Sequence, residues 1–440
     1  MPRVQNVCTG GGITDSVNTS FPVISLAVDP DDLYAERVGI FRNYAHQGQE
    51  RRASFTYFDE EGKEAINKHV GIRVRGEGTR DRDPKSFTIK ARKTYDGQGY
   101  FPYIFFPGAK VNSTIIVRHR EPSYMDGFLQ SLVSDRSVAT QSQQLVNVYL
   151  NGDFYGEFAL MEKYDDDYFA AHYGIETDNI LAVKTHINND DYYPELEAGN
   201  ESDRKLYETM MDVITQLDMS NDANYRHFTN LVDIQSLIDY YVINIYVANT
   251  DARGFKHNAI IWRAIKPDDT VYGDGKWRFT LYDMDEALGD YTMDVFAHNH
   301  DYVPERMDPY FNKLMQNDEF KESFTRRFQE IANSNFDADT VINKLHHDYG
   351  PNADMEEFFA NRYEFAIAQM YDYIENLDMY TADIEHKLAS EPTDMKNDTN
   401  SYVNLFIVTF GTFTFPVFLL LMYMADLRRI KIHDQHKMAA

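Results

Sequence analysis

Residues 249–262 read NTDARGFKHNAIIW and residues 277–289 read WRFTLYDMDEALG, and these two stretches determine how the rest of this 440-residue chain is interpreted. The segment before them predicts a helix, because its apolar side chains recur at spacings of three and four and so share one face: Ile234, Leu237, Ile238, Tyr241, Ile245 and Ala248. The helix is expected to end in the turn-forming residues 249–254.

Two short strands, at 259–262 and 277–282, are expected to follow this helix. Asp251, Asn258 and Asp283 then fall in the loops or at the ends of these elements. Phosphoryl transfer needs such groups: one carboxylate orients the proton of an attacking hydroxyl, and a second carboxylate and an amide hold Mg²⁺. Asp251 is the candidate for the first role, and Asn258 and Asp283 for the second. The alternative is structural, since Asp, Asn and Gly favour loops and strand ends for conformational reasons.

These residues resemble the CotH kinase-like family, atypical protein kinases first known from bacterial spore coats and also found on fungal surfaces. The family has an Asn-x-Asp loop, here residues 249–251, and an Asn that opens the next strand, here Asn258. It also has a Trp/Tyr-Asp-x-Asp/Asn strand end followed by Gly, here residues 282–285 with Gly289. The resemblance implies ATP and Mg²⁺ or Mn²⁺ as cofactors. It adds Asp285 to the candidate metal ligands, although this position is sometimes Asn in the family.

Two strands nearer the N-terminus, 70–75 and 86–90, flank a Gly-containing turn and carry basic side chains. Such a turn can bring backbone N–H groups close to phosphate, but an ordinary hairpin with a solvated basic face has the same pattern. The family carries an Arg-Gly-x-x-Ser/Thr turn and then a Lys-containing Ser-Phe strand. On that resemblance Lys90 is the candidate phosphate-binding lysine with Arg75 nearby, and Lys85 is the weaker alternative.

The sequence Asn151-Gly152 predicts a type I′ turn, and the strand that follows ends at Glu162. Asn-Gly-x-x-x-Gly before a strand ending in Glu is a hallmark of the same family. Since an acid pairs the phosphate-binding lysine in kinases, Glu162 is expected to pair Lys90. The alternative is a surface acid at a strand end. The acidic run at residues 165–167 is interpreted as a solvated turn.

The resemblance implies an α+β, two-lobed atypical protein-kinase-like fold with an antiparallel N-terminal sheet and a helical C-terminal region. We expect a flexible lead at 1–19 and a kinase-like domain at 20–388, with an N-lobe at about 20–165 and a C-lobe at about 166–388. Residues 266–275 are interpreted as a polar hairpin insertion. The remaining expected elements are strands at 21–28, 54–58, 115–118 and 146–150 and helices at 124–135, 206–217, 228–246, 309–315, 318–334, 338–349 and 355–377.

Composition excludes some classes of function. Lys plus Arg minus Asp plus Glu is 43 − 70 = −27, which argues against nucleic acid as a partner because phosphate would be repelled. Aromatic residues make up 14% and hydrophobic residues 43% of the chain, as expected for a folded protein. Cys8 is the only cysteine, so no intrachain disulfide can form.

The C-terminal end predicts one transmembrane helix. Residues 403–425 form a nearly continuous apolar run of 23 residues, long enough to cross a hydrocarbon core of roughly 30 Å. A buried core helix is the alternative, but it would be shorter and have a polar face. Residues 389–402 form a polar linker. The basic tail at 426–440 is expected to face the cytosol by the positive-inside rule.

This topology places the kinase-like domain on the lumenal or extracellular side. Four N-glycosylation sequons, at Asn18, Asn112, Asn200 and Asn397, are compatible with that side. The expected function is transfer of the ATP γ-phosphoryl to Ser or Thr of secreted or surface proteins. A non-catalytic adhesin or receptor module is the main alternative, and a Ca²⁺-binding ectodomain is a third. The joint presence of the acidic and basic site residues favours the enzyme, because an adhesin does not need that set.

Overall fold

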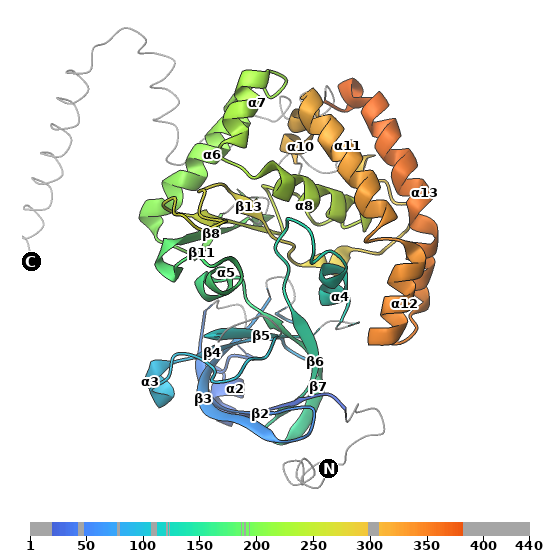
Figure 1. Ribbon diagram of the computed structural model, residues 1–440. Coiled ribbons are helices and arrows are strands. Elements are labelled where there is room, and N and C mark those ends of the chain that lie inside the picture. The colour runs from blue at the N-terminus through green and yellow to red at the C-terminus, as the bar shows by residue number, and fades with distance from the viewer. Residues whose placement is uncertain are drawn as a thin grey trace, which may run out of the picture. The chain divides into compact units, whose positions relative to one another are not determined.

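In the computed structural model, the N-terminal strands close into a barrel and most helices follow in the C-terminal part (Figure 1). The structure describes residues 20–42, 48–76, 80–106, 112–119, 122, 124–185, 187–188, 191–192, 194–297 and 308–381, all within one compact unit, Met1–Glu385. The predicted lead, linker, transmembrane span at 403–425 and basic tail lie outside these residues. Among the helices that are described, none combines the length and apolar character needed to cross a membrane.

The barrel has the strand order β1-β2-β3-β4-β5-β7-β6, closed by a pairing of β1 with β6. Its strands are β1 Val23–Val28, β2 Arg51–Phe58, β3 Glu64–Val74, β4 Phe87–Ala91, β5 Thr114–Arg118, β6 Gln143–Leu150 and β7 Asp153–Glu162. The prediction of an antiparallel sheet is therefore correct for six pairs but misses the closure, because β1 pairs in parallel with β6. Closure leaves no strand edge unpaired in the barrel.

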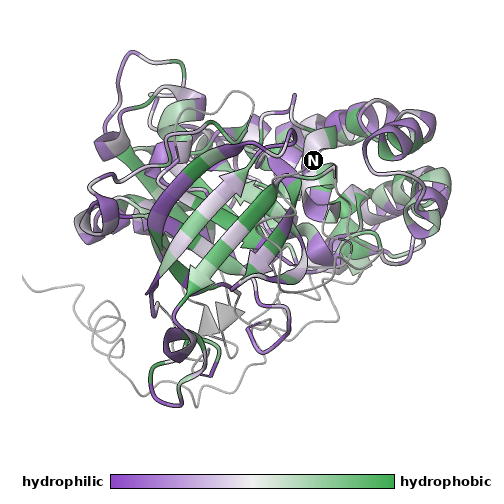
Figure 2. Ribbon diagram, turned by 90° about the horizontal axis from the view of Figure 1, so that it is seen from below, coloured by the Kyte–Doolittle hydropathy of each residue, from purple (hydrophilic) through white to green (hydrophobic). Residues whose placement is uncertain are grey.

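Strand alternation divides the barrel residues into two faces. Phe55, Ile72, Ile89, Val117 and Leu160 point inward and pack in one apolar core. In Figure 2, which views the barrel from below, green segments alternate along the strands with white and purple ones. The hairpin between β6 and β7 turns at Asn151 and Gly152, whose φ angles of 53° and 93° confirm the predicted type I′ turn. The short helices α2 Pro30–Tyr34 and α3 Lys93–Asp96 also belong to this part.

A second, four-stranded antiparallel sheet underlies the C-terminal part, in the order β11-β8-β12-β13. Its strands are β8 Ile180–Thr185, β11 Glu195–Ala198, β12 Ala259–Ala264 and β13 Arg278–Phe279. The helices are α4 Met125–Leu132, α5 Asp166–Tyr173, α6 Arg204–Gln216, α7 Asp222–Thr229, α8 Ile234–Tyr246, α10 Pro309–Met315, α11 Asp318–Asn333, α12 Ala338–Asp348 and α13 Ala353–Glu375. Together these elements confirm a mixed α+β fold with a helical C-terminal region.

Helix α8 is buried along nearly its whole length and leads directly into the 249–254 loop. Its Asp239 carboxylate receives hydrogen bonds from Arg327 at 2.5 and 2.9 Å, so the buried charge is paired. The buried Arg362 of α13 donates to the carbonyl oxygens of Tyr246 at 2.7 Å and Ile245 at 3.1 Å. Because the last carbonyls of a helix lack partners within it, Arg362 fixes the end of α8 from which the loop starts.

Several local predictions are wrong. The helix expected at 228–246 begins only at Ile234, because Asp233 caps α8 by accepting a hydrogen bond from the Ser236 backbone N–H at 3.2 Å; residues 228–229 end α7 instead. The polar insertion at 266–275 reverses the chain without forming strands: the Asp268 backbone N–H donates to the Gly273 carbonyl oxygen at 2.8 Å, and the Asp268 side chain accepts from the Thr270 backbone N–H at 2.9 Å. Asp165 is buried rather than solvated, and it begins α5 by accepting from the backbone N–H of Tyr168 at 3.2 Å.

Candidate active site

The loop after α8 brings Asp251 and Asn258 into direct contact. The Nδ2 of Asn258 donates to the Oδ2 of Asp251 at 2.8 Å. Asn249 holds the loop, because its buried side chain accepts from the Asp251 backbone N–H at 3.2 Å and donates to Asn244 at 2.9 Å. The Tyr240 hydroxyl of α8 donates to the carbonyl oxygen of Asn258 at 3.2 Å. The predicted loop acid and amide thus form one unit.

Asp251 is charged and partly open to solvent, with a side chain 35% exposed. Burial acts to raise the pKa of its carboxyl, but the hydrogen bond and charge of His257 and the charge of Arg253 outweigh burial, so the pKa is lowered. His257 Nε2 and Arg253 Nη2 each lie 3.5 Å from a carboxylate oxygen of Asp251. The carboxylate can therefore accept a hydrogen bond from a hydroxyl at neutral pH.

Asp283 follows β13, and its charge acts on the Asp251 carboxyl. Asp283 and Asn258 both have left-handed backbone conformations, with φ of 56° and 51°. Such conformations in residues other than glycine concentrate at functional sites. The Tyr164 hydroxyl donates to the Leu281 carbonyl oxygen at 2.9 Å and so holds the backbone two residues before Asp283. The structure therefore assembles all three residues that the 249–289 region predicted.

Arg118, at the end of β5, was missed by sequence reasoning although it contacts both acids of the 283–285 segment. Its guanidinium bonds Asp283 and Asp285 and also Asp126 of α4, the last at 2.6 Å. Burial acts to raise the pKa of Asp283, but the charge of Arg118 lowers it to about 2. No local pattern in residues 114–118 marks this arginine, because Asp283 and Asp285 lie more than a hundred positions away along the chain.

Basic side chains from β3 and from the residues directly after β4 and β7 gather around Lys90. Lys90 points away from the barrel core because its neighbours Ile89 and Ala91 point into it. Burial lowers the pKa of Lys90, and the positive charges of Arg73 and Lys163 lower it further. The Lys90 side chain has no ion pair or hydrogen bond with the described residues, which leaves its ammonium group available for an anion.

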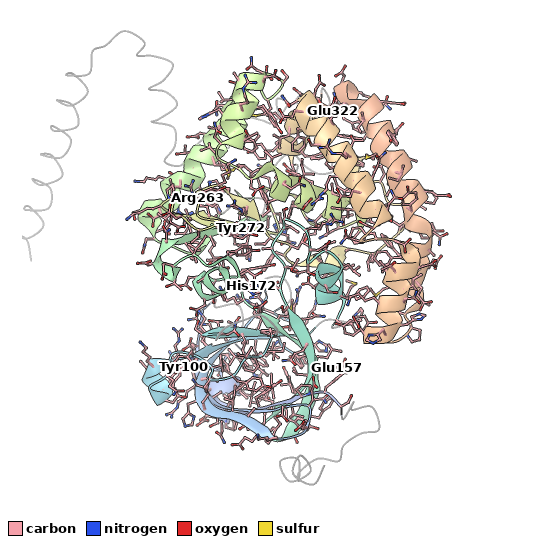
Figure 3. All side chains as sticks on the ribbon, in the orientation of Figure 1. Tyr100, Glu157, His172, Arg263, Tyr272 and Glu322 are labelled. Carbon is pink, nitrogen blue, oxygen red and sulfur yellow. The ribbon has the colours of Figure 1, made fainter. Side chains whose placement is uncertain are left out.

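Glu162 does not pair with Lys90. Its carboxylate accepts from the Ser142 backbone N–H at 3.0 Å and lies 2.9 Å from Nε2 of His172, which Figure 3 labels between the barrel and the C-terminal part. The side chain is only 1% exposed, so both oxygens are committed to these partners. The next residue, Lys163, forms an ion pair with Glu197 of β11 at 2.5 Å.

Glu50 is the acid whose charge acts on Lys90. It lies over Gly71 of β3, where an added Cβ would come within 2.3 Å of its carboxyl group. It pairs with Arg92 at 2.6 Å and with Arg73 at 3.3 Å. The position of Glu50 just before β2 has no sequence signal, and only the β2–β3–β4 pairing brings it to this face.

The remaining basic candidates differ in role. Arg75 donates to the Tyr282 hydroxyl at 3.0 Å and so joins the barrel to the residue before Asp283. Lys85 is 4% exposed, and its ammonium group donates to the carbonyl oxygens of Arg80 at 2.9 Å and Arg82 at 3.3 Å. Lys85 therefore holds its own loop.

The donor set fits a divalent cation of the hard, oxygen-preferring kind. Among the described residues, Oδ2 of Asp283 and Oδ1 of Asn258 receive no hydrogen bond. The Asp283 side chain is 38% exposed, whereas that of Asp285 is 6% exposed and bonded to Arg118. Asp283 and Asn258 can thus act as ligands, and the predicted role of Asp285 as a ligand does not fit its burial and its bond to Arg118.

Comparison with known families identifies the family of this chain. Residues 72–383 match the family described as "CotH kinase protein", and this range covers more than half of the chain and includes Asp251, Asn258, Asp283, Arg118 and Lys90. The chain therefore belongs to the CotH kinase family. A search of curated proteins finds no match.

The two lysines of the 85–90 segment give a direct test of these assignments. We expect Lys90→Ala to weaken ATP binding by roughly 10–100-fold, the value of one or two charge-assisted contacts, while thermal stability stays nearly constant. Lys85→Ala should instead lower the free energy of unfolding by about 1–3 kcal/mol, because buried loop carbonyls lose their donor. Calorimetric ATP titration and thermal denaturation of both variants measure this, and the reverse pattern would show that Lys85 binds phosphate.

Proposed function

We propose that this protein is a protein kinase that transfers the γ-phosphoryl group of ATP to Ser or Thr hydroxyls of secreted or surface proteins and requires Mg²⁺ or Mn²⁺. The observation that supports it most is the hydrogen-bonded pair of Asp251 and Asn258 beside Asp283. Membership of the CotH kinase family supports the same reaction class. The cationic barrel face around Lys90 adds a site for phosphate.

In the proposed step, the γ-phosphoryl group moves from the β,γ-bridging oxygen of ATP to the oxygen of the acceptor hydroxyl. The acceptor hydroxyl oxygen forms a bond to the γ-phosphorus while the bond from that phosphorus to the β,γ-bridging oxygen breaks, and ADP leaves with the electron pair. Asp251 orients the hydroxyl and takes its proton as the new bond forms. The lowered pKa of Asp251 makes it a weak base, which suits late proton transfer in a loose transition state.

Lys90 and its cationic neighbours hold the nucleotide phosphates and balance their charge. A divalent cation on Asp283 and Asn258 would neutralise charge on the phosphate oxygens when bound. Arg75 contributes by keeping the Tyr282–Asp283 segment next to the barrel face. Positioning and electrostatics together account for the chemistry, since phosphoryl transfer requires little covalent participation by the protein.

The proposal is tested with the full chain purified in a mild detergent. ATP with Mg²⁺ or Mn²⁺ should raise its melting temperature, because a ligand that binds only the folded state stabilises it. Radioactive phosphate from [γ-³²P]ATP should appear on the protein itself or on a casein-like acceptor. A wild-type chain that shows neither response in either metal would falsify the enzyme assignment and favour an adhesin or receptor module.

We further propose that residues 403–425 anchor the protein and that the kinase domain faces the lumen or the cell exterior. The described part of the chain limits which sequons could be used on that side. Asn112 has a side chain 6% exposed and is inaccessible in the folded domain, whereas Asn200 is exposed. Asn18 and Asn397 lie outside the described residues. The expected glycan site within the described residues is therefore Asn200.

Deleting residues 403–425 tests the anchor. The deletion is expected to release a soluble, folded protein, because residues 1–385 form their own compact unit. Fractionation after carbonate extraction, with circular dichroism of the released protein, measures the outcome. A deletion variant that stays in the membrane fraction or aggregates would show that this segment belongs to the folded core, and the proposed topology would then be abandoned.

A further inference from the structure

Arg118 is the only described arginine that contacts three carboxylates at the candidate active site. Its Nη1 donates to Asp126 at 2.6 Å, and its Nη2 donates to Oδ1 of Asp283 and to Oδ2 of Asp285. Asp126 comes from α4 and is itself held by Gln130 Nε2 at 2.8 Å. The guanidinium fork thus connects β5 of the barrel with α4 and with the segment after β13.

The three carboxylates differ in what they can still bind. The side chains of Asp126 and Asp285 are 4% and 6% exposed, so Arg118 and the surrounding protein enclose them. The Asp283 side chain is 38% exposed, and its Oδ2 receives no hydrogen bond from the described residues. One arginine also leaves the group of three carboxylates with a formal charge of −2, which a divalent cation would balance.

We propose that Arg118 is a positioning residue that makes Asp283 a one-oxygen metal ligand and keeps Asp285 out of the ligand set. This inference rests on the proposed function. Holding Oδ1 of Asp283 leaves Oδ2 as the oxygen that can bind a cation. The planar fork is needed because two nitrogens must reach acids on two different elements at once, which the single ammonium group of a lysine does not reproduce.

A competing interpretation has the opposite consequence. If Arg118 merely occupies the place of the cation, a metal must displace it. A substitution that weakens the contacts of Arg118 with the carboxylates should then strengthen metal binding. If Arg118 positions Asp283, the same substitution should let the Asp283 side chain move and so weaken metal binding. The sign of the change therefore separates the two.

The test measures Mn²⁺ bound by the full chain in detergent, by electron paramagnetic resonance, with a non-hydrolysable ATP analogue present. Arg118→Lys is expected to weaken Mn²⁺ binding by roughly 10–100-fold, the usual effect of removing a group that orients a metal ligand. Asp285→Asn should leave Mn²⁺ affinity within about threefold of wild type, because this side chain lies outside the ligand set. Arg136→Lys is the matched control, since Arg136 makes three side-chain contacts with residues 330–335 near the end of α11 instead.

Each outcome is informative. Equal or tighter Mn²⁺ binding by Arg118→Lys overturns the proposal, and so does a loss of tenfold or more in Asp285→Asn. If Arg118→Lys does not fold, Asp285→Asn alone decides whether Asp285 is a ligand. A wild-type chain that binds no Mn²⁺–nucleotide contradicts the proposed function itself, whereas wild-type binding with the wrong response of the variants contradicts only the role of Arg118.

Discussion

Replacing Asp251 with asparagine is expected to lower phosphate transfer by about 10²–10⁴-fold, the contribution of a positioned acid–base group, and to leave ATP–metal binding nearly unchanged. Asparagine keeps the shape of the side chain and an oxygen that can still accept from Asn258 Nδ2, a contact of 2.8 Å in the wild type. It removes the negative charge that would orient and deprotonate the acceptor hydroxyl. Single-turnover transfer from radioactive ATP and calorimetric ATP titration measure the two quantities separately.

Asp212→Asn provides the matched control for Asp251→Asn, because Asp212 lies on the exposed face of α6 and undergoes the same chemical change. Its transfer rate should equal that of the wild type. A transfer rate in Asp251→Asn that stays within about threefold of wild type would remove Asp251 from the mechanism, since a hydroxyl-orienting carboxylate cannot be lost at so small a cost.

Asp283→Asn is expected to weaken metal-dependent nucleotide binding by at least about 100-fold. Loss of a metal ligand should cost at least as much affinity as loss of a group that only orients a ligand. A hard cation loses a charged oxygen ligand, and the nucleotide phosphates lose the charge that neutralises them. Asparagine is the better substitution because it tolerates the left-handed conformation at φ 56°, whereas Asp283→Ala would add backbone strain. Titration of Mn²⁺ with the ATP analogue measures the change.

The contrast between the two substitutions is the main check on the assigned roles. Asp251→Asn should bind and not transfer, and Asp283→Asn should fail to bind at metal concentrations that saturate the wild type. Identical losses of binding in both variants, with unchanged thermal stability, would show that the two carboxylates share one role. The separate assignments to proton and metal would then be wrong.

The local sequence predicted a helix or turn correctly where the residues that stabilise it lie within the same short segment. The apolar spacing before Ala248 predicted α8, and Asn151–Gly152 predicted its turn because both residues accept positive φ. The predicted helix 309–315 coincides with α10 Pro309–Met315. The loop acid, the amide and the strand-end acid could be named as candidates because they belong to one continuous region, where a family pattern preserves spacing along the chain.

Strand pairing and charge pairing between segments far apart along the chain could not be predicted in this way. The barrel closes through β1 and β6, which are separated by more than a hundred residues, and no local pattern distinguishes an edge strand from a closed one. Glu162 was expected to pair Lys90 by analogy with other kinases. Its register opposite Ile115 and its nearby partner His172 direct the carboxylate elsewhere.

The sequence by itself pointed to the CotH kinase family and to Asp251, Asn258, Asp283 and Lys90 as candidate site residues, because each follows from spacing or from a family motif. Only the tertiary structure decided which other charged groups contact these candidates. Arg118 encloses Asp285 and leaves Asp283 open, and Glu50 rather than Glu162 acts on Lys90. The physical reason is that charge interactions depend on distance in space and on burial, and both are set by strand closure and packing between segments far apart along the chain.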